Sequence, residues 1–358
     1  MIERKKYDFT PDYRHIVDAA WNREAARLPI YEQHFGGEIM PKLTGQTPYA
    51  MIYSKDMKES KEGFRQLWDF HRQLGFDVCC HDFWFNSILE GGGALGGHTD
   101  GCIKDRDDFE RYPWDELPQR YFDYYAPYIR NFAETCPPGM KAIGGAGNGL
   151  FEAVQDIVGY VNLCYMKADD EELYYDVFTA MSKAIVKVWE RFMAEFRDAY
   201  CIMRFCDDLG IKHQTLLSPD DIRRCIIPTY RQVTDIVHQY NRPFALHSCG
   251  NITEVMDDLI DTAKIDAKHS NEDIIMPFTD VVRTYGHRLG NFGGLDVGVL
   301  TSESPETIRK MTMECLDEIK GHGGVAFSSG SSVPDYIPAE GYLAMNEAVR
   351  DWRGDKRI

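Results

Sequence analysis

Residues 243–250 of the chain read Pro-Phe-Ala-Leu-His-Ser-Cys-Gly, a short apolar strand that ends in histidine, serine, cysteine and glycine. Helical periodicity follows, and the same order of strand and helix recurs, with strands predicted at residues 265–269, 288–292 and 324–327. One of the intervening helices is predicted at residues 278–285. Four consecutive strand–helix units favour parallel strands joined by right-handed crossovers.

The N-terminal half contains four further strand candidates, at residues 28–31, 76–80, 141–143 and 200–205. Other helices are predicted at residues 61–74, 171–199, 218–240 and 304–320. The last two begin with a Ser-Pro pair typical of a capped helix, and Pro228 predicts a kink. Eight units predict an α/β fold, a (β/α)8 TIM barrel in a single domain over residues 1–358. An open doubly wound sheet is the alternative, but the first strand lacks a following G-x-G-x-x-G.

A long segment, residues 86–138, separates the second and third predicted strands. It contains the glycine-rich run 91–97 and then an acidic, aromatic stretch. Long insertions in a barrel usually belong to the functional face or to an interface, and we predict such a role here. The glycine run lacks the Lys-Ser/Thr pair that would follow in a phosphate-binding loop.

The chain has 358 residues and a formal net charge of −17, from 40 Lys and Arg against 57 Asp and Glu. This acidic balance argues against a nucleic-acid or anionic-membrane binder, which needs clustered cationic side chains. No apolar stretch predicts a membrane span, and no signal-peptide pattern is found. Ten cysteines without a C-x-x-C pair are typical of reduced thiols, so we expect a cytoplasmic protein.

Polar side chains gather at the carboxyl ends of the predicted strands, where barrel enzymes place their chemistry. The candidate catalytic residues are Asp207, Asp208 and His81. The candidate substrate-binding residues are Glu32, Phe83, Trp84, Asn148 and Asp296.

Several of these residues have a structural alternative. Adjacent strand residues face opposite ways, so at most one of Asp207 and Asp208 points inward as a metal ligand or general acid–base. The other interpretation of an aspartate here is a helix N-cap. His81 is equally explained as a hydrogen-bonded core histidine, and Phe83 and Trp84 as core residues rather than the wall of an aromatic pocket.

The tripeptide His247-Ser248-Cys249 is the sharpest pattern in the chain. Residues two apart on a strand share a face, and imidazole and thiolate are preferred zinc ligands. Phe244 and Leu246 have the opposite parity and can pack on the helix layer. A hydrogen-bonded histidine beside a buried cysteine is the alternative.

The chain contains a series of short motifs: 207-DDLG-210, 217-LSP-219, 246-LHSCGN-251, 293-GGLD-296, and 330-GSSVP-334 followed by Pro338. As a set, in this order and spacing, they resemble the uroporphyrinogen decarboxylase superfamily. Decarboxylases of this superfamily carry an arginine-rich segment after the first strand, whereas residues 29–37 here contain no arginine and include Glu32. The resemblance therefore favours the cobamide-dependent methyltransferase branch, in which an H-x-C pair binds zinc, and it implies that His247 and Cys249 are metal ligands.

The chain departs from the pattern of the thiol-methylating members, which take a third zinc ligand from a cysteine after the last strand. Here Ser331 stands at that position. The candidates for the third ligand are Cys206, Glu32, Asp207, Asp208, His81 and Ser331 itself. The change argues against a thiol substrate and favours a demethylating enzyme.

The resemblance implies a zinc-dependent methyltransferase. Its methyl donor would be a small molecule such as an aryl methyl ether, as in an O-demethylase component, and its acceptor the cobalt of a corrinoid (cobalamin) protein. That corrinoid protein must be a separate chain, since no D-x-H-x-x-G pattern occurs here. One alternative is a lyase that decarboxylates a small acid without a metal, and another is a non-catalytic member that binds a small molecule. A homodimer is compatible with the sequence.

Overall fold

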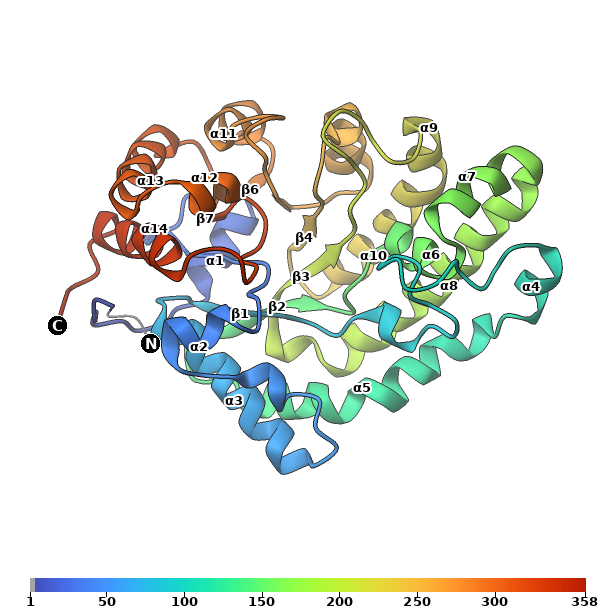
Figure 1. Ribbon diagram of the computed structural model, residues 1–358, viewed down its shortest axis with the longest axis horizontal. Coiled ribbons are helices and arrows are strands. Elements are labelled where there is room, and N and C mark those ends of the chain that lie inside the picture. Colours follow the sequence, from blue (N-terminus) through green and yellow to red (C-terminus); the bar gives the residue numbers. More distant parts are fainter. Residues whose placement is uncertain (1–3) are drawn as a thin grey trace.

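The computed structural model describes residues 4–358 and contains seven parallel strands joined by helices (Figure 1). The strands are β1 (Val78–Asp82), β2 (Lys141–Gly145), β3 (Tyr200–Cys206), β4 (Phe244–His247), β5 (Ala267–His269), β6 (Gly290–Leu295) and β7 (Val325–Ser329). Each strand pairs with the next one along the chain, so the sheet has the order β1-β2-β3-β4-β5-β6-β7. This sequential parallel order confirms the α/β class and excludes the doubly wound alternative, in which the strand order reverses.

The first predicted strand, residues 28–31, is reduced to a single parallel bridge between Ile30 and Phe327 of β7. Tyr31 donates its N–H to the Phe327 carbonyl at 2.9 Å, and Phe327 donates to the Pro29 carbonyl at 3.0 Å. Pro29 itself has no N–H to extend a ladder. The sheet is therefore a curled, TIM-barrel-like sheet of seven strands with a short eighth segment beside β7. The prediction of eight full strands is wrong for this first segment.

Fourteen α-helical segments accompany the sheet among residues 4–358. They are α1 (Arg14–Ala20), α2 (Ile39–Thr44), α3 (Met57–Gln73), α4 (Arg106–Arg111), α5 (Leu117–Glu134), α6 (Leu150–Val158), α7 (Tyr160–Asp169), α8 (Glu171–Glu195), α9 (Pro219–Asp221), α10 (Ile227–Gln239), α11 (Phe278–Tyr285), α12 (Val297–Ser302), α13 (Pro305–Ile319) and α14 (Ala339–Trp352). The two Ser-Pro caps are confirmed: Ser218 accepts from the N–H of Asp221, and Ser304 from that of Thr307. Residues Ile222–Ile226 form a π-helical turn between α9 and α10, and Pro228 is the second residue of α10.

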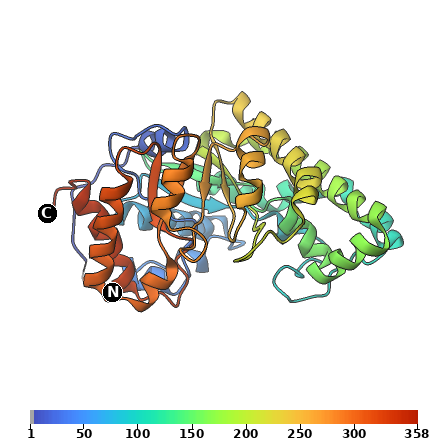
Figure 2. The same ribbon diagram turned by 90° about the horizontal axis from the view of Figure 1, so that it is seen from above.

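The predicted insertion, residues 86–138, divides into two parts in the structure. Its second part contains α5, which packs against α3 and α8 in the helix layer, as the crossover helix of an ordinary strand–helix unit does. Its first part consists of loops, the 3-10 helices Phe85–Ile88 and Trp114–Glu116, and α4. In Figures 1 and 2, α4, α6 and α7 lie together beyond the edge of the sheet.

Two groups of buried apolar residues stabilise the fold. The inner group fills the curled sheet and includes Val78, Ile202, Ala245 and Phe292, while α1 covers one end of it through Ile16, Ala19 and Ala20. The outer group lies between the sheet and the helices and includes Phe244 and Leu246. Because α1 closes the amino-terminal end of the barrel, the carboxyl end is left for a site.

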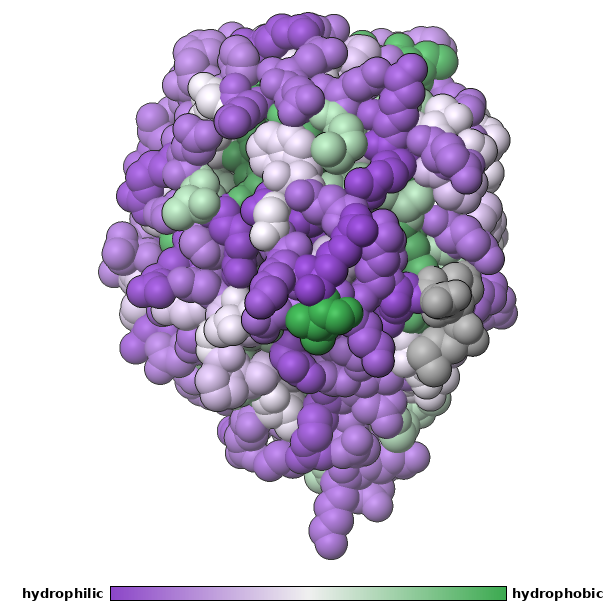
Figure 3. Space-filling view, turned by 90° about the vertical axis from the view of Figure 1, so that its left-hand side faces the viewer, coloured by the Kyte–Doolittle hydropathy of each residue, from purple (hydrophilic) through white to green (hydrophobic). Residues whose placement is uncertain are grey.

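The outer helices present polar side chains to solvent. Figure 3 views the molecule from the side that carries α13 and α14, and this face is mostly hydrophilic, with hydrophobic residues scattered singly. Within residues 4–358, none of the helices combines the length and the apolar character that crossing a membrane requires.

Candidate metal site

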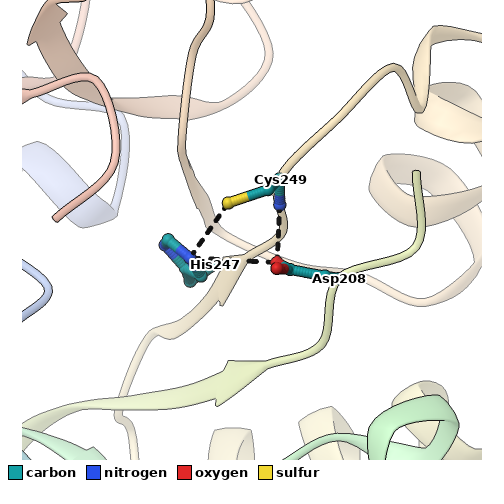
Figure 4. Close-up of side chains that lie close together, drawn as sticks. All are labelled: Asp208, His247 and Cys249. Atoms are coloured by element: carbon teal, nitrogen blue, oxygen red, sulfur yellow. Dashed lines mark hydrogen bonds and ion pairs between the residues drawn. The ribbon is translucent and has the colours of Figure 1, made fainter. Parts of the chain in front are cut away.

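Asp208, His247 and Cys249 meet at the carboxyl ends of β3 and β4 (Figure 4). Nε2 of His247 lies 3.5 Å from Sγ of Cys249 and 3.9 Å from Oδ1 of Asp208. The three potential ligand atoms all lie within 4.8 Å of one another. A nitrogen, a sulfur and a carboxylate oxygen at this separation can surround one tetrahedral metal ion and leave a fourth position open.

The backbone holds the two loops of the site together. The Cys249 N–H donates to Oδ1 of Asp208 at 2.8 Å, and the Leu209 N–H donates to Oγ of Ser248 at 3.1 Å. Gly250 has φ of +78°, and a Cβ there would lie 2.3 Å from the Gly210 carbonyl oxygen. Glycine therefore allows the β4 loop to turn closely over the β3 loop and brings Cys249 to Asp208.

The tautomer of His247 follows from its buried neighbour His269 on β5. Nε2 of His269 faces the Ser329 carbonyl oxygen at 3.3 Å and the Ser328 hydroxyl at 3.2 Å. The hydroxyl gives its proton to the Ser329 carbonyl at 2.6 Å, so both neighbours accept and Nε2 carries the proton. Nδ1 of His269 is then an acceptor, and it lies 2.8 Å from Nδ1 of His247. Burial lowers the pKa of both histidines, that of His269 to about 3, so both rings are neutral. His247 donates from Nδ1, which leaves the lone pair of Nε2 directed at Asp208 and Cys249.

Cys249 is half-buried and carries its proton when no cation is present. Burial raises the pKa of its thiol to about 11. Oγ of Ser331 lies 3.6 Å from Sγ and Oγ of Ser270 lies 3.7 Å from it. Ser331, one of the predicted third ligands, therefore borders the site, whereas Asp208 has its carboxylate in it.

Asp207 and Asp208 point to different surroundings, as adjacent residues at a strand end should. Asp207 is fully buried and accepts from the N–H groups of Phe151 and Glu152, in the first turn of α6, and from the hydroxyl of Tyr230. Asp207 thus binds the amino-terminal end of α6 from the end of β3, while the N-cap residue of that helix is Gly149. Asn148 lies nearby, where it accepts from the N–H of Asn86 and donates to Glu152.

The other predicted residues lie away from Asp208, His247 and Cys249, which we call the triad. His81 is buried against Phe64, Phe83 and Phe132 on the helix-facing side of β1, where Nε2 lies 3.2 Å from the Tyr53 hydroxyl. Asp296 caps α12 through the N–H of Gly298.

Cys206, a candidate third ligand, lies inside the barrel instead. Its Sγ is 3.4 Å from Nε2 of Gln33 and 3.9 Å from Oδ2 of Asp82. His269 and Asp82 are residues that the sequence analysis did not select as site residues. The alternation along β1 and β5 could have placed both on the inner face.

Glu32, another candidate ligand, is fully buried beside β7 and outside the group of three. Its carboxylate accepts from the N–H of Ser329 at 2.9 Å and from the Ser329 hydroxyl at 2.6 Å. Burial raises the pKa of Glu32 from its ordinary value of 4.5 to about 8. A carboxyl group that is protonated at neutral pH is a poor metal ligand but a good buried hydrogen-bonding group.

The elevated pKa of Glu32 predicts a pH dependence of stability. Between pH 4.5 and 8 the folded state keeps a proton that the unfolded state has lost, so this contribution is complete below pH 4.5 and is lost as the pH rises through 8. In that window the wild-type free energy of unfolding should fall by up to about 1.4 kcal/mol per pH unit from this group. We expect Glu32→Gln to flatten the dependence, as measured by urea unfolding at pH 5 and pH 8. The exposed Glu110→Gln is the control, and a Glu32→Gln slope equal to that of wild type would contradict the prediction.

Comparison with known proteins identifies the family. The family model of uroporphyrinogen decarboxylase (URO-D) matches residues 96–352. The chain belongs to this family, as its motifs had indicated. A search of curated proteins finds no match.

Two solved structures are similar in fold. A methyltransferase from Methanosarcina mazei has a TM-score of 0.67 and 14% sequence identity, over 96% of this chain and 99% of that one. A putative vitamin-B12 independent methionine synthase from Listeria monocytogenes has a TM-score of 0.51 and 13% identity, over 91% and 98% of the two chains. At such low sequence identities the similarity concerns the fold. In both cases the similar fold extends over more than 90% of this chain.

Proposed function

We propose that this protein is a zinc-dependent methyltransferase that moves a methyl group from a small methylated donor to the cobalt of a corrinoid carried by a separate protein. The observation that supports this proposal best is the close approach of Asp208, His247 and Cys249. An unprotonated imidazole nitrogen and a carboxylate oxygen lie 3.9 Å apart beside a cysteine thiol, at the open end of the barrel. Two electron-rich atoms so placed favour a cation between them. The similar methyltransferase structure supports the same class of reaction. The second structure, a putative vitamin-B12 independent methionine synthase, supports methyl transfer in general and not the corrinoid acceptor.

The donor set fits zinc. His247, Cys249 and Asp208 would hold the ion, and His269 orients the imidazole from behind. Zinc supplies Lewis-acid stabilisation of negative charge that develops on the oxygen or other leaving atom of the donor. The methyl group leaves without its bonding electron pair, which stays on the leaving atom. Asp208 also orients the loop by accepting from the Cys249 N–H, so this carboxylate has both a binding and a positioning role.

Metal removal tests the proposal. Protein dialysed against a strong chelator should lose the transfer of a methyl group to reduced cobalamin, and one equivalent of zinc should restore it. The absorbance of methylcobalamin measures the transfer. A protein that transfers methyl groups equally well without metal, or that releases carbon dioxide from a small acid without metal, would contradict the proposal and favour the decarboxylase alternative.

The role of His269 gives a further prediction. His269→Phe keeps the ring volume but removes the acceptor for Nδ1 of His247, and zinc affinity should fall by about 10- to 100-fold. His269→Asn can still accept from His247 and should retain most of the affinity. Competition with a chromophoric chelator measures both, with the exposed His287→Phe as control. If His269→Phe binds zinc as tightly as the wild type, the tautomer of His247 does not depend on His269.

A further inference from the structure

Strand β5 carries a lysine, Lys268, on the side that faces the helices. Its neighbours Ala267 and His269 face the barrel interior: Ala267 packs in the inner apolar group, and His269 contacts the ring of Tyr31. Because side chains alternate along a strand, Lys268 points to the other side of the sheet. Both neighbours are buried, whereas Lys268 keeps part of its surface accessible. Lysine is seldom placed in the layer between a sheet and its helices unless a carboxylate pairs with it.

A cavity of about 40 Å³ lies on this side of the sheet, and Lys268 is part of its wall. One water-sized group needs roughly 10–15 Å³ of such volume, so the cavity has room for about three of them. Most of the remaining wall is apolar and comes from the segment after β4, from α11 and from the loops on either side of α11, through Ile252, Met256, Ile275, Met276, Val281 and Leu289. Methionine side chains adapt their shape readily, which suits a wall that admits a small ligand.

The amino group of Lys268 has few partners in the protein. Nζ donates to the backbone carbonyl of Ser270, and it forms no salt bridge within residues 4–358. Glu272, the carboxylate in the cavity wall, instead accepts from the N–H of Gly250 at 3.2 Å. A lysine amino group can make several hydrogen bonds, and one acceptor leaves most of this capacity unused. The cavity therefore contains a reactive amine that the fold itself does not neutralise.

The surroundings also make this amine a better nucleophile. Burial lowers the pKa of Lys268 from its ordinary value of 10.5 to about 8. Cys249, Asp208 and Glu272 oppose this shift, so desolvation is the dominant effect. At pH 7 about one amine in ten is then neutral, against about one in 2,500 for an ordinary lysine. A desolvated lysine in an apolar cavity is the arrangement in which this side chain attacks carbonyl compounds.

We propose that Lys268 binds small aliphatic aldehydes covalently, as an imine that forms in this cavity. The lone pair of Nζ adds to the carbonyl carbon, a C–N bond forms, and one proton moves from nitrogen to oxygen. The carbon–oxygen bond of this carbinolamine then breaks, and the hydroxyl group leaves as water with the remaining proton of nitrogen, whose electron pair completes the C=N bond. The step needs no oxidant or reductant. It is also independent of the proposed methyl transfer.

The size and polarity of the cavity define the ligand class. Its volume suits an aldehyde of about two to four non-hydrogen atoms, such as acetaldehyde. The apolar wall favours an alkyl group over a charged substituent, which would lose its hydration without a partner.

Reductive trapping of the wild-type protein tests the site. Acetaldehyde with sodium cyanoborohydride converts an imine into a stable N-ethyl-lysine, and peptide mapping by mass spectrometry gives the initial rate at each lysine. We expect labelling of Lys268 at pH 7 to be at least about tenfold faster than labelling of the exposed Lys212. A rate at Lys268 equal to or below that at Lys212 would overturn the proposal.

A larger aldehyde shows whether the cavity selects the ligand. Benzaldehyde carries a ring that exceeds the available volume, so the ratio of the rates at Lys268 and Lys212 should fall below one. The exposed lysine reacts with both aldehydes and corrects for their different intrinsic reactivity. If the ratio is the same for the two aldehydes, the cavity has no part in the reaction and the proposal is wrong.

Variants assign the fast reaction to the amine itself. Lys268→Arg keeps a cation and a donor for the Ser270 carbonyl but forms no stable imine, and Lys268→Met keeps the length of the side chain without the amine. Both should lose the fast-labelled site, while the control Lys212→Met keeps it. A fast first equivalent of label that persists in folded Lys268→Arg, measured by intact mass, would show that another group reacts and would also overturn the proposal.

Discussion

Replacing His247 by alanine should lower zinc affinity by at least about a thousandfold and abolish methyl transfer, and Cys249→Ser should have a similar effect. Structural zinc sites contribute about 10–16 kcal/mol in all, so the loss of one ligand of three or four is expected to cost about 4 kcal/mol, which is a thousandfold in affinity. Cys249 is half-buried, but His247 is buried and hydrogen-bonded to His269, so the unfolding of each variant is measured as well. Chelator competition and metal analysis of the purified variants provide the measurement.

The controls for this prediction are the exposed His213→Ala and Cys164→Ser, which should bind zinc as the wild type does. Asp208→Asn separates ligation from positioning, because an amide oxygen can still accept from the Cys249 N–H but carries no charge. We expect this variant to lose zinc affinity by about ten- to a hundredfold with little change in unfolding. Unchanged zinc binding in both His247→Ala and Cys249→Ser would exclude the triad as the metal site.

The largest expected effect on stability concerns the ion pair of Arg204 and Asp82 inside the barrel. Both side chains are 1% exposed, and Arg204 also donates to the Tyr31 hydroxyl. Asp82→Ala leaves a guanidinium in the barrel without its carboxylate, and we expect the free energy of unfolding to fall by about 3–5 kcal/mol. Arg204→Ala leaves the carboxylate instead and should cost a similar amount.

The combined replacement Asp82→Leu with Arg204→Met should be close to neutral, because no uncompensated charge remains and apolar groups fill similar volume. Urea unfolding of the single and combined variants gives the comparison, and Glu62→Ala, which breaks the exposed pair with Arg65, should change stability by no more than about 1 kcal/mol. If the single variants are no more costly than Glu62→Ala, the pair is not stabilising in the way its burial implies.

Much of the fold could be predicted because it depends on neighbours along the chain. The alternation of Phe244, Leu246 and His247 shows which face of β4 is inward, since the side chains of a strand alternate with a period of two. The caps at Ser218 and Ser304 begin their helices within one residue of the expected position, because a serine side chain satisfies an N–H group only three residues away.

The errors at the first two predicted strands arise because the ends of a strand depend on partners that are distant in the sequence. The strand expected at residues 76–80 extends over Val78–Asp82, so His81 and Asp82 belong to the strand itself. The alternation that points Val78 inward then places Asp82 on the inner face and His81 on the outer one. The segment at residues 28–31 is cut to one bridge because its pairing partner, Phe327, lies about 300 residues further along the chain. Strand length depends on that distant partner and not on the apolar run itself.

The candidate site shows the same division. The two-residue period of a strand predicted that the imidazole and the thiol of residues 247–249 share a face. In the structure β4 ends at His247, and the turn at Gly250 positions Cys249 in the loop that follows. The choice of Asp208 over Asp207 could not be predicted, because two identical neighbours differ only in what the fold brings to each: the first turn of α6 to Asp207, and the Cys249 loop to Asp208. The other two contacts join different strands. His247 and His269 are register partners on the paired strands β4 and β5, whereas Asp82 on β1 meets Arg204 on β3 across β2, so both depend on how the sheet is assembled.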